Sequence, residues 1–252
     1  LLSRGLGDVY KRQNILRSTD NGSSFDNVTS PTTNRFYALG FGNNTFVIGG
    51  NPTNIVGADA SDNTIVRSTD NGSTWDNATT DNSTSHGYSR MVTGGIAYGN
   101  NVFVGVGEMG TIMRSTDDGL TWHYASSPIV STDSSCNCDL YGVAFGNNTF
   151  VAVGYAGKIV RSTDNGSSFD NVTSPTVRPL YTGVAFGNNT FVVGLDNGYV
   201  IRSTDNGTTW NNVNISNNSQ TLRGITFGNN RFVGVGYSGN VVISTDNGTT
   251  WD

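Results

Sequence analysis

One eight-residue motif constrains this chain more than any other feature, because it occurs six times with little change. The copy at 162–169 reads Ser-Thr-Asp-Asn-Gly-Ser-Ser-Phe. The six copies lie at 18–25, 68–75, 115–122, 162–169, 203–210 and 244–251. Successive copies start 50, 47, 47, 41 and 41 residues apart, and a period of this size is typical of stacked supersecondary units. The sequence therefore predicts a repeat architecture.

The chemistry inside the motif is that of a tight turn. An Asp before Asn-Gly accepts hydrogen bonds from the backbone N–H groups that follow it, and the Gly takes a positive φ. The aromatic residue at the eighth position is large enough to anchor each unit between neighbouring sheets. We interpret these residues as structural and not catalytic, because they stand at the same point of every repeat. They are Asp20, Asp70, Asp117, Asp164, Asp205 and Asp246, with Trp75, Trp122, Trp210 and Trp251.

The pattern Ser-x-Asp-x-Gly-x-Thr-Trp, complete at 203–210 and 244–251, resembles the Asp-box, also called the BNR repeat. The resemblance covers residues 14–252. It implies a β-propeller with the box in the turn between the third and fourth strands of each blade. Asp-box proteins include sialidases, other glycoside hydrolases, photosystem II assembly factors, sortilin-type receptors and uncharacterised bacterial secreted or surface proteins. The resemblance is therefore informative about fold and much less so about function.

Each repeat also supplies the other strands of a blade. Two apolar runs flank Gly-Asn-Asn, as at 141–154, and Asn tolerates the left-handed conformation that two-residue hairpin turns require. We expect an all-β propeller of four-stranded antiparallel blades, five full blades plus one partial N-terminal blade, in a single domain over 14–252. Residues 1–13 have no repeat character, and we expect an artefactual or disordered leader there. We also expect the chain to be a piece of a larger propeller.

Composition excludes several classes of partner. The net charge is −5 with a pI near 4.8, so there is no general attraction to nucleic acid or to an anionic membrane. Charged residues make up only 13% of the chain, against about 25% in typical domains. No motif points to a cofactor or to a metal site. Lys is scarce and Asn, Gly, Ser and Thr are abundant, and with the habit of the similar family this predicts an extracellular or cell-surface location.

Binding residues are expected on one face of the propeller. The loops that join strand four to strand one and strand two to strand three differ between repeats, and variable loops on a rigid scaffold commonly carry binding sites. Four arginines near the start of first strands are candidates for an anion site, as the resemblance to sialidases implies. They are Arg35, Arg90, Arg178 and Arg223, and the alternative is that they are surface arginines. The arginines that recur in register, such as Arg161, are interpreted as blade-surface residues.

A catalytic site is the competing interpretation. Glycoside hydrolases need two carboxylates, or a tyrosine nucleophile with acidic partners, in a central cleft. The candidate acids are Glu108, Asp139 and Asp196, and Tyr155 and Tyr237 stand at the place equivalent to Glu108 in other repeats. No motif ties a pair of them together. The favoured hypothesis is a non-catalytic module that binds a glycan or a protein, and the alternative is a sialidase-like glycoside hydrolase.

The two cysteines lie in the longest loop as Cys136-Asn137-Cys138. One Cys-x-Cys offers too few ligands for a structural zinc site. The sequence leaves two possibilities open, a local disulfide or two free thiols.

Overall fold

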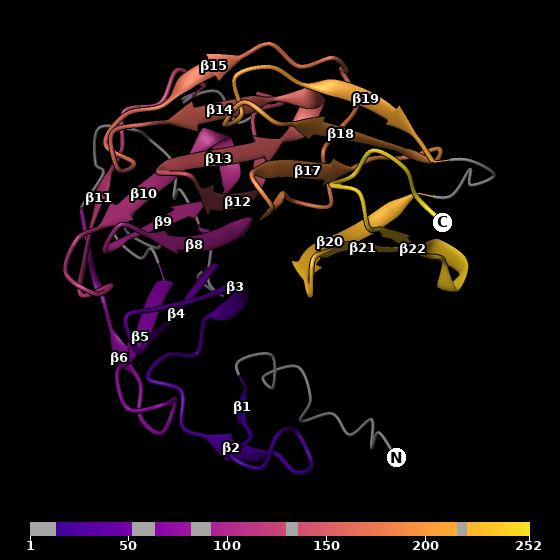
Figure 1. Ribbon diagram of the computed structural model, residues 1–252. Coiled ribbons are helices and arrows are strands. Elements are labelled where there is room, and N and C mark those ends of the chain that lie inside the picture. The colour runs from indigo at the N-terminus through magenta and orange to yellow at the C-terminus, as the bar shows by residue number, and fades with distance from the viewer. Residues whose placement is uncertain (1–13, 52–63, 82–91, 130–135, 216–220) are drawn as a thin grey trace.

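The computed structural model of the chain describes residues 14–51, 64–81, 92–129, 136–215 and 221–252, and these residues fold into successive antiparallel sheets (Figure 1). The sheets follow one another around a common centre. They form an arc that runs from the N-terminal sheet to the C-terminal one. This arrangement is a β-propeller and confirms the predicted fold class. The leader predicted at 1–13 lies outside the described residues.

Twenty-two strands and three single-turn 3₁₀ helices make up the described chain. The first two sheets contain β1 (Ile15–Arg17) and β2 (Asp26–Val28), then β3 (Arg35–Gly42), β4 (Thr45–Asn51), β5 (Thr64–Ser68) and β6 (Asp76–Asn77). The third contains β7 (Thr79–Thr80), β8 (Gly95–Gly99), β9 (Val102–Val106), β10 (Ile112–Ser115) and β11 (Thr121–Tyr124). The fourth and fifth contain β12 (Leu140–Gly146), β13 (Thr149–Gly154), β14 (Ile159–Ser162) and β15 (Asp170–Val172), then β16 (Ala185–Gly187), β17 (Thr190–Gly194), β18 (Tyr199–Ser203) and β19 (Asn211–Asn214). The sixth contains β20 (Leu222–Gly228), β21 (Arg231–Gly236) and β22 (Val241–Ser244), and the 3₁₀ helices are η2 (Glu108–Gly110), η3 (Tyr155–Gly157) and η4 (Tyr237–Gly239).

We number the sheets as blades one to six. In blades two to five the strand order follows the chain from the centre outward, and each strand pairs antiparallel with the next. Among the described residues, blade one has the two outer strands only, as predicted for the partial blade. Blade three gains a strand that the sequence did not predict, because β7 pairs in parallel with the outermost strand β11. Blade six has three strands among the described residues, and beside β22 Asp252 exchanges hydrogen bonds of 2.9 and 3.0 Å with Ile243.

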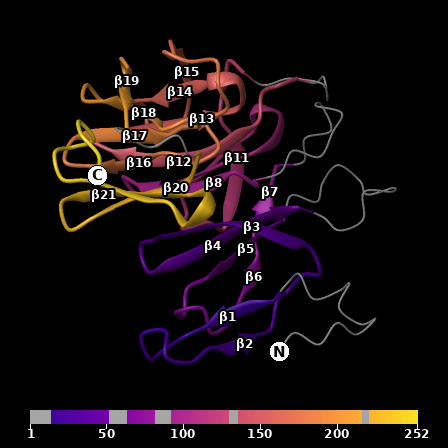
Figure 2. The same ribbon diagram turned by 90° about the vertical axis from the view of Figure 1, so that its right-hand side faces the viewer.

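The two kinds of repeated turn lie on one side of the propeller, at the left in Figure 2. Both Asn residues of every Gly-Asn-Asn hairpin have positive φ, for example 49° at Asn147 and 58° at Asn148. This is the left-handed conformation that the sequence predicts there. The described turns from second to third strands and the starts of the first strands lie at the opposite ends of the strands. We call that side the mouth.

Each copy of the eight-residue motif, which we call the box, closes its own turn through the aspartate. At the fourth box, Asp164 Oδ1 accepts the Ser162 hydroxyl at 2.7 Å, and Oδ2 accepts the Ser168 hydroxyl at 2.6 Å. Backbone amides complete the set, such as that of Ser168 at 3.0 Å. In the four boxes that end in Trp, the indole N–H donates to the carbonyl of the box glycine, at 3.0 Å for Trp122. The box is thus a locally satisfied turn that also fixes a buried ring.

Small residues let the innermost strands approach one another closely. A Cβ atom added to Gly142 would lie only 2.5 Å from the Cα atom of Gly183 in the next blade. Real side chains do not reach this distance, so only glycine fits. The close approach of the two backbones explains the glycine at this position of β12.

The hydrophobic core is divided into five clusters, and each lies between two consecutive blades. Between blades four and five, Val151 and Ile159 pack against Phe191 and Trp210. Trp122 is fully buried between blades two and three. Blade-to-blade packing therefore supplies the core, as expected of a repeat protein.

Recurring hydrogen bonds from an arginine and a hairpin asparagine join each blade to the next, and we call this pair the inter-blade clasp; the joint from blade one has the arginine bond alone, and the joint from blade five has the asparagine bond alone. Arg161 Nε donates to the carbonyl of Asn206, the fourth residue of the following box, at 2.7 Å. Asn147 Nδ2, from the hairpin of the same blade as Arg161, donates to Asn206 Oδ1 at 2.9 Å. Equivalent arginine bonds run from Arg17 to Asn71, Arg67 to Asp118 and Arg114 to Asn165. Equivalent Asn bonds run from Asn43 to Asp118, Asn100 to Asn165 and Asn188 to Asn247.

The sequence predicted these in-register arginines only as blade-surface residues and did not predict this inter-blade contact. They are partly buried, and their Nε atoms point across the interface instead of into solvent. The clasp weakens toward the C-terminal end. Arg202 Nε is buried without a hydrogen-bond partner in the described chain, and Ile243 replaces the arginine in blade six.

Candidate binding mouth

The turns between second and third strands place one side chain per blade at the mouth. In η2, η3 and η4 the middle residue is left-handed, with φ between 52° and 58°, and the third residue is Gly. In blade five, Asn197 and Gly198 have the same conformation, so Asp196 takes the first position. The four side chains at this first position are Glu108, Tyr155, Asp196 and Tyr237. Four of the residues selected from the sequence thus share one structural position.

A second set of mouth residues comes from β-bulges at the start of first strands. The pairing of β12 with β13 shifts between Leu140 and Gly142, which leaves Tyr141 as the bulged residue. The same shift leaves Tyr37 in blade two and Arg223 in blade six. A bulge redirects a side chain and is common next to functional sites. In three blades a β-bulge at the start of the first strand therefore places a large side chain at the mouth.

Arg223 lies between two aromatic rings. Its guanidinium carbon is 4.5 Å from the ring centre of Tyr237 and 5.2 Å from that of Tyr181. The guanidinium also donates a hydrogen bond to the Tyr237 hydroxyl. Cation–π contacts and this bond hold the cation in place at the surface.

Arg223, Tyr181 and Asp196 line a small cavity of about 140 Å³, which we call the arginine pocket. Arg178 borders it, because its Nη1 atom lies 2.5 Å from Asp196 Oδ1. Both partners of this ion pair are more than a third exposed. Asp196 is therefore already paired with one cation, while Arg223 has no carboxylate partner among the ion pairs of the described residues.

A second cavity, of about 270 Å³, lies beside the arginine pocket. We call it the acidic pocket, because its lining includes Glu108 and Asp139 together with Tyr37 and Tyr141. Burial raises the pKa of Glu108, and the neighbouring Asp139 carboxylate raises it further. Burial, followed by Asp139, Tyr181 and Tyr155, raises the pKa of Tyr141 to about 12. The pocket thus combines two carboxyl groups with two phenol groups.

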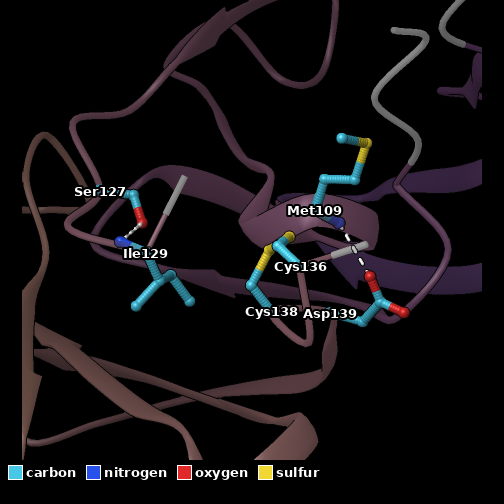
Figure 3. Close-up of a disulfide and its surroundings, with 6 residues drawn as sticks. All are labelled: Met109, Ser127, Ile129, Cys136, Cys138 and Asp139. Carbon is cyan, nitrogen blue, oxygen red and sulfur yellow. Dashed lines mark hydrogen bonds between the residues drawn. A yellow bond between two sulfur atoms is a disulfide. The ribbon is translucent and has the colours of Figure 1, made fainter. Parts of the chain in front are cut away.

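Asp139 is fixed by the turn opposite it. Its Oδ1 atom accepts the backbone N–H of Met109 at 2.9 Å (Figure 3). Cys136 and Cys138, directly before it, form a disulfide, which settles the two possibilities left by the sequence. The disulfide lies against the η2 turn that carries Glu108. The loop is therefore tied down where it delivers the carboxylate.

Stacked tyrosines connect the two pockets. The ring centres of Tyr141 and Tyr181 are 5.0 Å apart with planes inclined by 31°. Tyr37, Tyr181 and Tyr237 are 45–55% exposed. The mouth is thus a row of partly exposed tyrosines with an acidic pocket near one end and an arginine near the other.

The structure brings together only part of the set selected from the sequence. Glu108 and Asp139 line the acidic pocket, Asp196 and Arg223 line the arginine pocket, and Arg178 pairs with Asp196. Arg35 is exposed at the start of β3 and lines neither pocket. Arg90 lies outside the described residues.

Sequence reasoning missed Tyr37, Tyr141 and Tyr181. Tyr37, Tyr141 and Arg223 each stand five residues before the glycine that ends the first strand. This common offset is the signal that finds Tyr37 and Tyr141, whereas Tyr181 stands six residues before Gly187 and has no such signal.

The described residues contain no group of three or more His, Cys, Asp or Glu side chains placed to hold a metal ion. Over the same residues, no helix has the length and apolar character needed to cross a membrane.

Comparison with known proteins gives structural neighbours only. No family model matches the sequence, and no curated protein sequence matches it. A solved structure of YCF48 bound to D1 peptide is 18% identical with a TM-score of 0.62, over 89% of this chain and 68% of that chain. YCF48 from Cyanidioschyzon merolae is 15% identical with a TM-score of 0.66, over 96% and 78%. A chain of a nidogen/laminin complex is 11% identical with a TM-score of 0.57, over 87% and 79%. At these identities the likeness supports the propeller fold and leaves the Asp-box family a prediction.

Proposed function

We propose that this chain is a non-catalytic β-propeller module that binds an extended segment of a partner protein across its mouth. The observation that carries the proposal is the row of tyrosines joining an acidic pocket to Arg223. Tyrosine provides large contact area with little loss of side-chain entropy, and Tyr and Arg are enriched at protein interfaces. The neighbouring structure of YCF48 with a D1 peptide shows that a propeller of similar fold takes a peptide.

The two ends of the row favour different groups on that segment. Glu108 and Asp139 favour a basic side chain, whereas Arg223 favours a carboxylate. A polypeptide supplies both kinds of group, and a neutral glycan supplies neither. A protein segment is therefore the preferred ligand, and binding to glycans alone would contradict the proposal.

The proposal includes a location outside the cell or on its surface. Two lysines in 252 residues and the abundance of Asn, Gly, Ser and Thr support it. The Cys136–Cys138 disulfide is compatible with an oxidising compartment.

The test is a parallel screen of the purified chain on a random peptide array and a glycan array. For the best peptide, Tyr181→Ala should weaken binding at least about tenfold, because it removes the contact between the two pockets. Phe25→Ala is the matched control, since this ring is 60% exposed but belongs to a box turn on the opposite side. Peptide binding unaffected by Tyr181→Ala, or binding to glycans alone, would contradict the proposal.

A specific observation also favours a second candidate, a glycoside hydrolase. Glu108 and Asp139 share one pocket, and the pKa of Glu108 is raised as a general acid requires. Fluorogenic glycosidase and sialidase substrates test it directly. Turnover that disappears in Glu108→Gln while the fold is retained would replace the binding proposal with the enzyme.

A further inference from the structure

The joint between blades three and four departs from the repeat at three neighbouring positions. The only two cysteines of the chain form a disulfide just before β12. Asp139 follows them, at a position that Pro179 and Thr221 take in blades five and six, since the leucine after each of these residues donates its N–H to the preceding blade. Met109 is the middle residue of η2, where η3 and η4 have smaller residues. Departures from a local rule concentrate at functional or strained sites.

Asp139 links the turns of the two blades. Its Oδ1 atom accepts the N–H of Met109 at 2.9 Å, in the turn of blade three (Figure 3). Its main-chain carbonyl accepts the N–H of Tyr155 at 2.8 Å, in the turn of blade four. The position of this residue therefore affects both turns, and with them Glu108 and Tyr155 at the mouth.

Met109 has a backbone conformation that needs support. Its φ of 56° and ψ of 29° are left-handed, which is uncommon for a long side chain. Such a conformation persists where the surrounding contacts over-determine it. The hydrogen bond to Asp139 is one of these contacts. Its loss would allow the η2 turn to relax, together with Glu108 at the start of that turn.

The disulfide restrains the backbone directly before Asp139. Its ring spans a single intervening residue, Asn137. When the ring is open, this segment regains conformational entropy of the same order as the net contribution of one hydrogen bond. The bond between Asp139 and Met109 would then form for only part of the time. A ring this short adds little to the stability of the whole fold, so the propeller persists in both states.

One sulfur of the pair is more accessible to a reductant than the other. Cys136 is partly exposed, whereas Cys138 is only 4% exposed. A thiolate of a dithiol therefore attacks Cys136 Sγ, the S–S bond breaks, and Cys138 leaves as a thiolate that takes up a proton. The second thiolate of the dithiol attacks the mixed disulfide and releases Cys136, which also takes up a proton. The chain gains two electrons, and the dithiol is oxidised to a disulfide.

We propose that Cys136–Cys138 is a regulatory disulfide. A dithiol reductant opens it, Asp139 leaves Met109 and the acidic pocket, and the mouth loses affinity for basic segments. The oxidised chain is thus the binding form. The change in affinity rests on the function proposed for the mouth, whereas the opening of the disulfide and the release of Asp139 do not.

Glu108 provides the first measurement, because it is the only glutamate of the chain. Selective ¹³C labelling of glutamate gives one carboxyl signal, and its pH titration reports on the acidic pocket. Burial and the Asp139 carboxylate raise the pKa of Glu108 in the oxidised chain. Reduction with dithiothreitol should lower the titration midpoint, because Asp139 moves away. Exchange of the Met109 amide should speed up at least about fivefold, while circular dichroism stays unchanged.

Two variants separate the disulfide from general effects of the reductant. The double variant Cys136→Ser/Cys138→Ser should show the lower Glu108 midpoint and the faster Met109 exchange with or without dithiothreitol. Asp139→Ala should show the same midpoint and should not respond to dithiothreitol, because it lacks the residue that transmits the change. A Glu108 midpoint and a Met109 exchange rate that are equal in the oxidised and reduced wild-type chain would overturn the proposal.

Peptide binding provides the last measurement. A basic peptide selected on the array should bind the reduced chain at least about fivefold more weakly than the oxidised chain. Equal affinity of the two forms would overturn the regulatory role. If no peptide binds either form while the Glu108 and Met109 signals respond to dithiothreitol, the function proposed for the mouth is contradicted and the release of Asp139 is confirmed.

Discussion

Replacing Arg161 with Met should destabilise the propeller by removing one inter-blade clasp. The Nε atom of Arg161 donates to the Asn206 carbonyl at 2.7 Å from a partly buried position. Hydrogen bonds from charged groups contribute about 1.5–3 kcal/mol, and partial exposure reduces this to about 1–2 kcal/mol. Met keeps the apolar stem that packs near Gly207, so the change reports mainly the lost hydrogen bond. The melting temperature should fall by about 2–8 °C for a chain of this length.

Arg178→Met provides the matched control. It also removes an arginine hydrogen bond, but to the exposed Asp196 carboxylate instead of to a following box. Exposed ion pairs contribute about 0–1 kcal/mol, so this variant should change stability little. Urea and thermal unfolding followed by circular dichroism measure both variants. If Arg161→Met is no less stable than Arg178→Met, the clasp does not hold blades together.

Three further outcomes follow from the geometry. Gly142→Ala should cost at least about 2 kcal/mol because its Cβ would meet backbone, while Gly228→Ala, with open space around it, should stay within about 0.5 kcal/mol in the same melts. Acid should destabilise the fold: hydrogen bonds from the amide and hydroxyl four residues later lower the pKa of Asp70 to about 2, below the ordinary 3.8. Stabilisation by such box aspartates is therefore complete above about pH 4 and lost toward pH 2, and an acid titration that shows no loss of structure in this window would count against it. The Cys136–Cys138 disulfide closes only a very short loop, so its reduction should lower the free energy of unfolding by about 2 kcal/mol or less. Calorimetry with a reductant should therefore show that the fold is retained.

The fold was predictable because the repeat carries it in local chemistry. The box turn and the Gly-Asn-Asn hairpin each need only their own residues, as Asp164 and Asn148 show. The role of Arg161 was not predictable, because its partner Asn206 lies 45 residues away in the next repeat. Both residues recur with the period, so periodicity cannot distinguish a contact within a blade from one between blades.

The mouth was only partly predictable for a different reason. The turn position shared by Glu108 and Tyr237 is visible as an equivalent offset in each repeat. The bulge at Tyr141 adds a residue to one strand and not to its partner, so simple alternation assigns the wrong direction to that side chain. The stack of Tyr141 on Tyr181 joins two repeats and appears only when the blades are assembled.

The inter-blade clasp gives the array a direction, since each blade donates from its third strand and hairpin and accepts at its box. A blade that has both the donor groups and the acceptor box can follow or precede any other such blade, because the same hydrogen bonds form at each joint. Duplication or loss of a whole repeat would therefore preserve the joints, while the mouth side chains change independently. Two blades depart from this pattern. Arg202 of blade five has no hydrogen-bond partner for its Nε atom in the described chain, and Ile243 replaces the arginine in blade six, so a blade copied after blade six would be joined by the hairpin asparagine and apolar contact without the arginine bond.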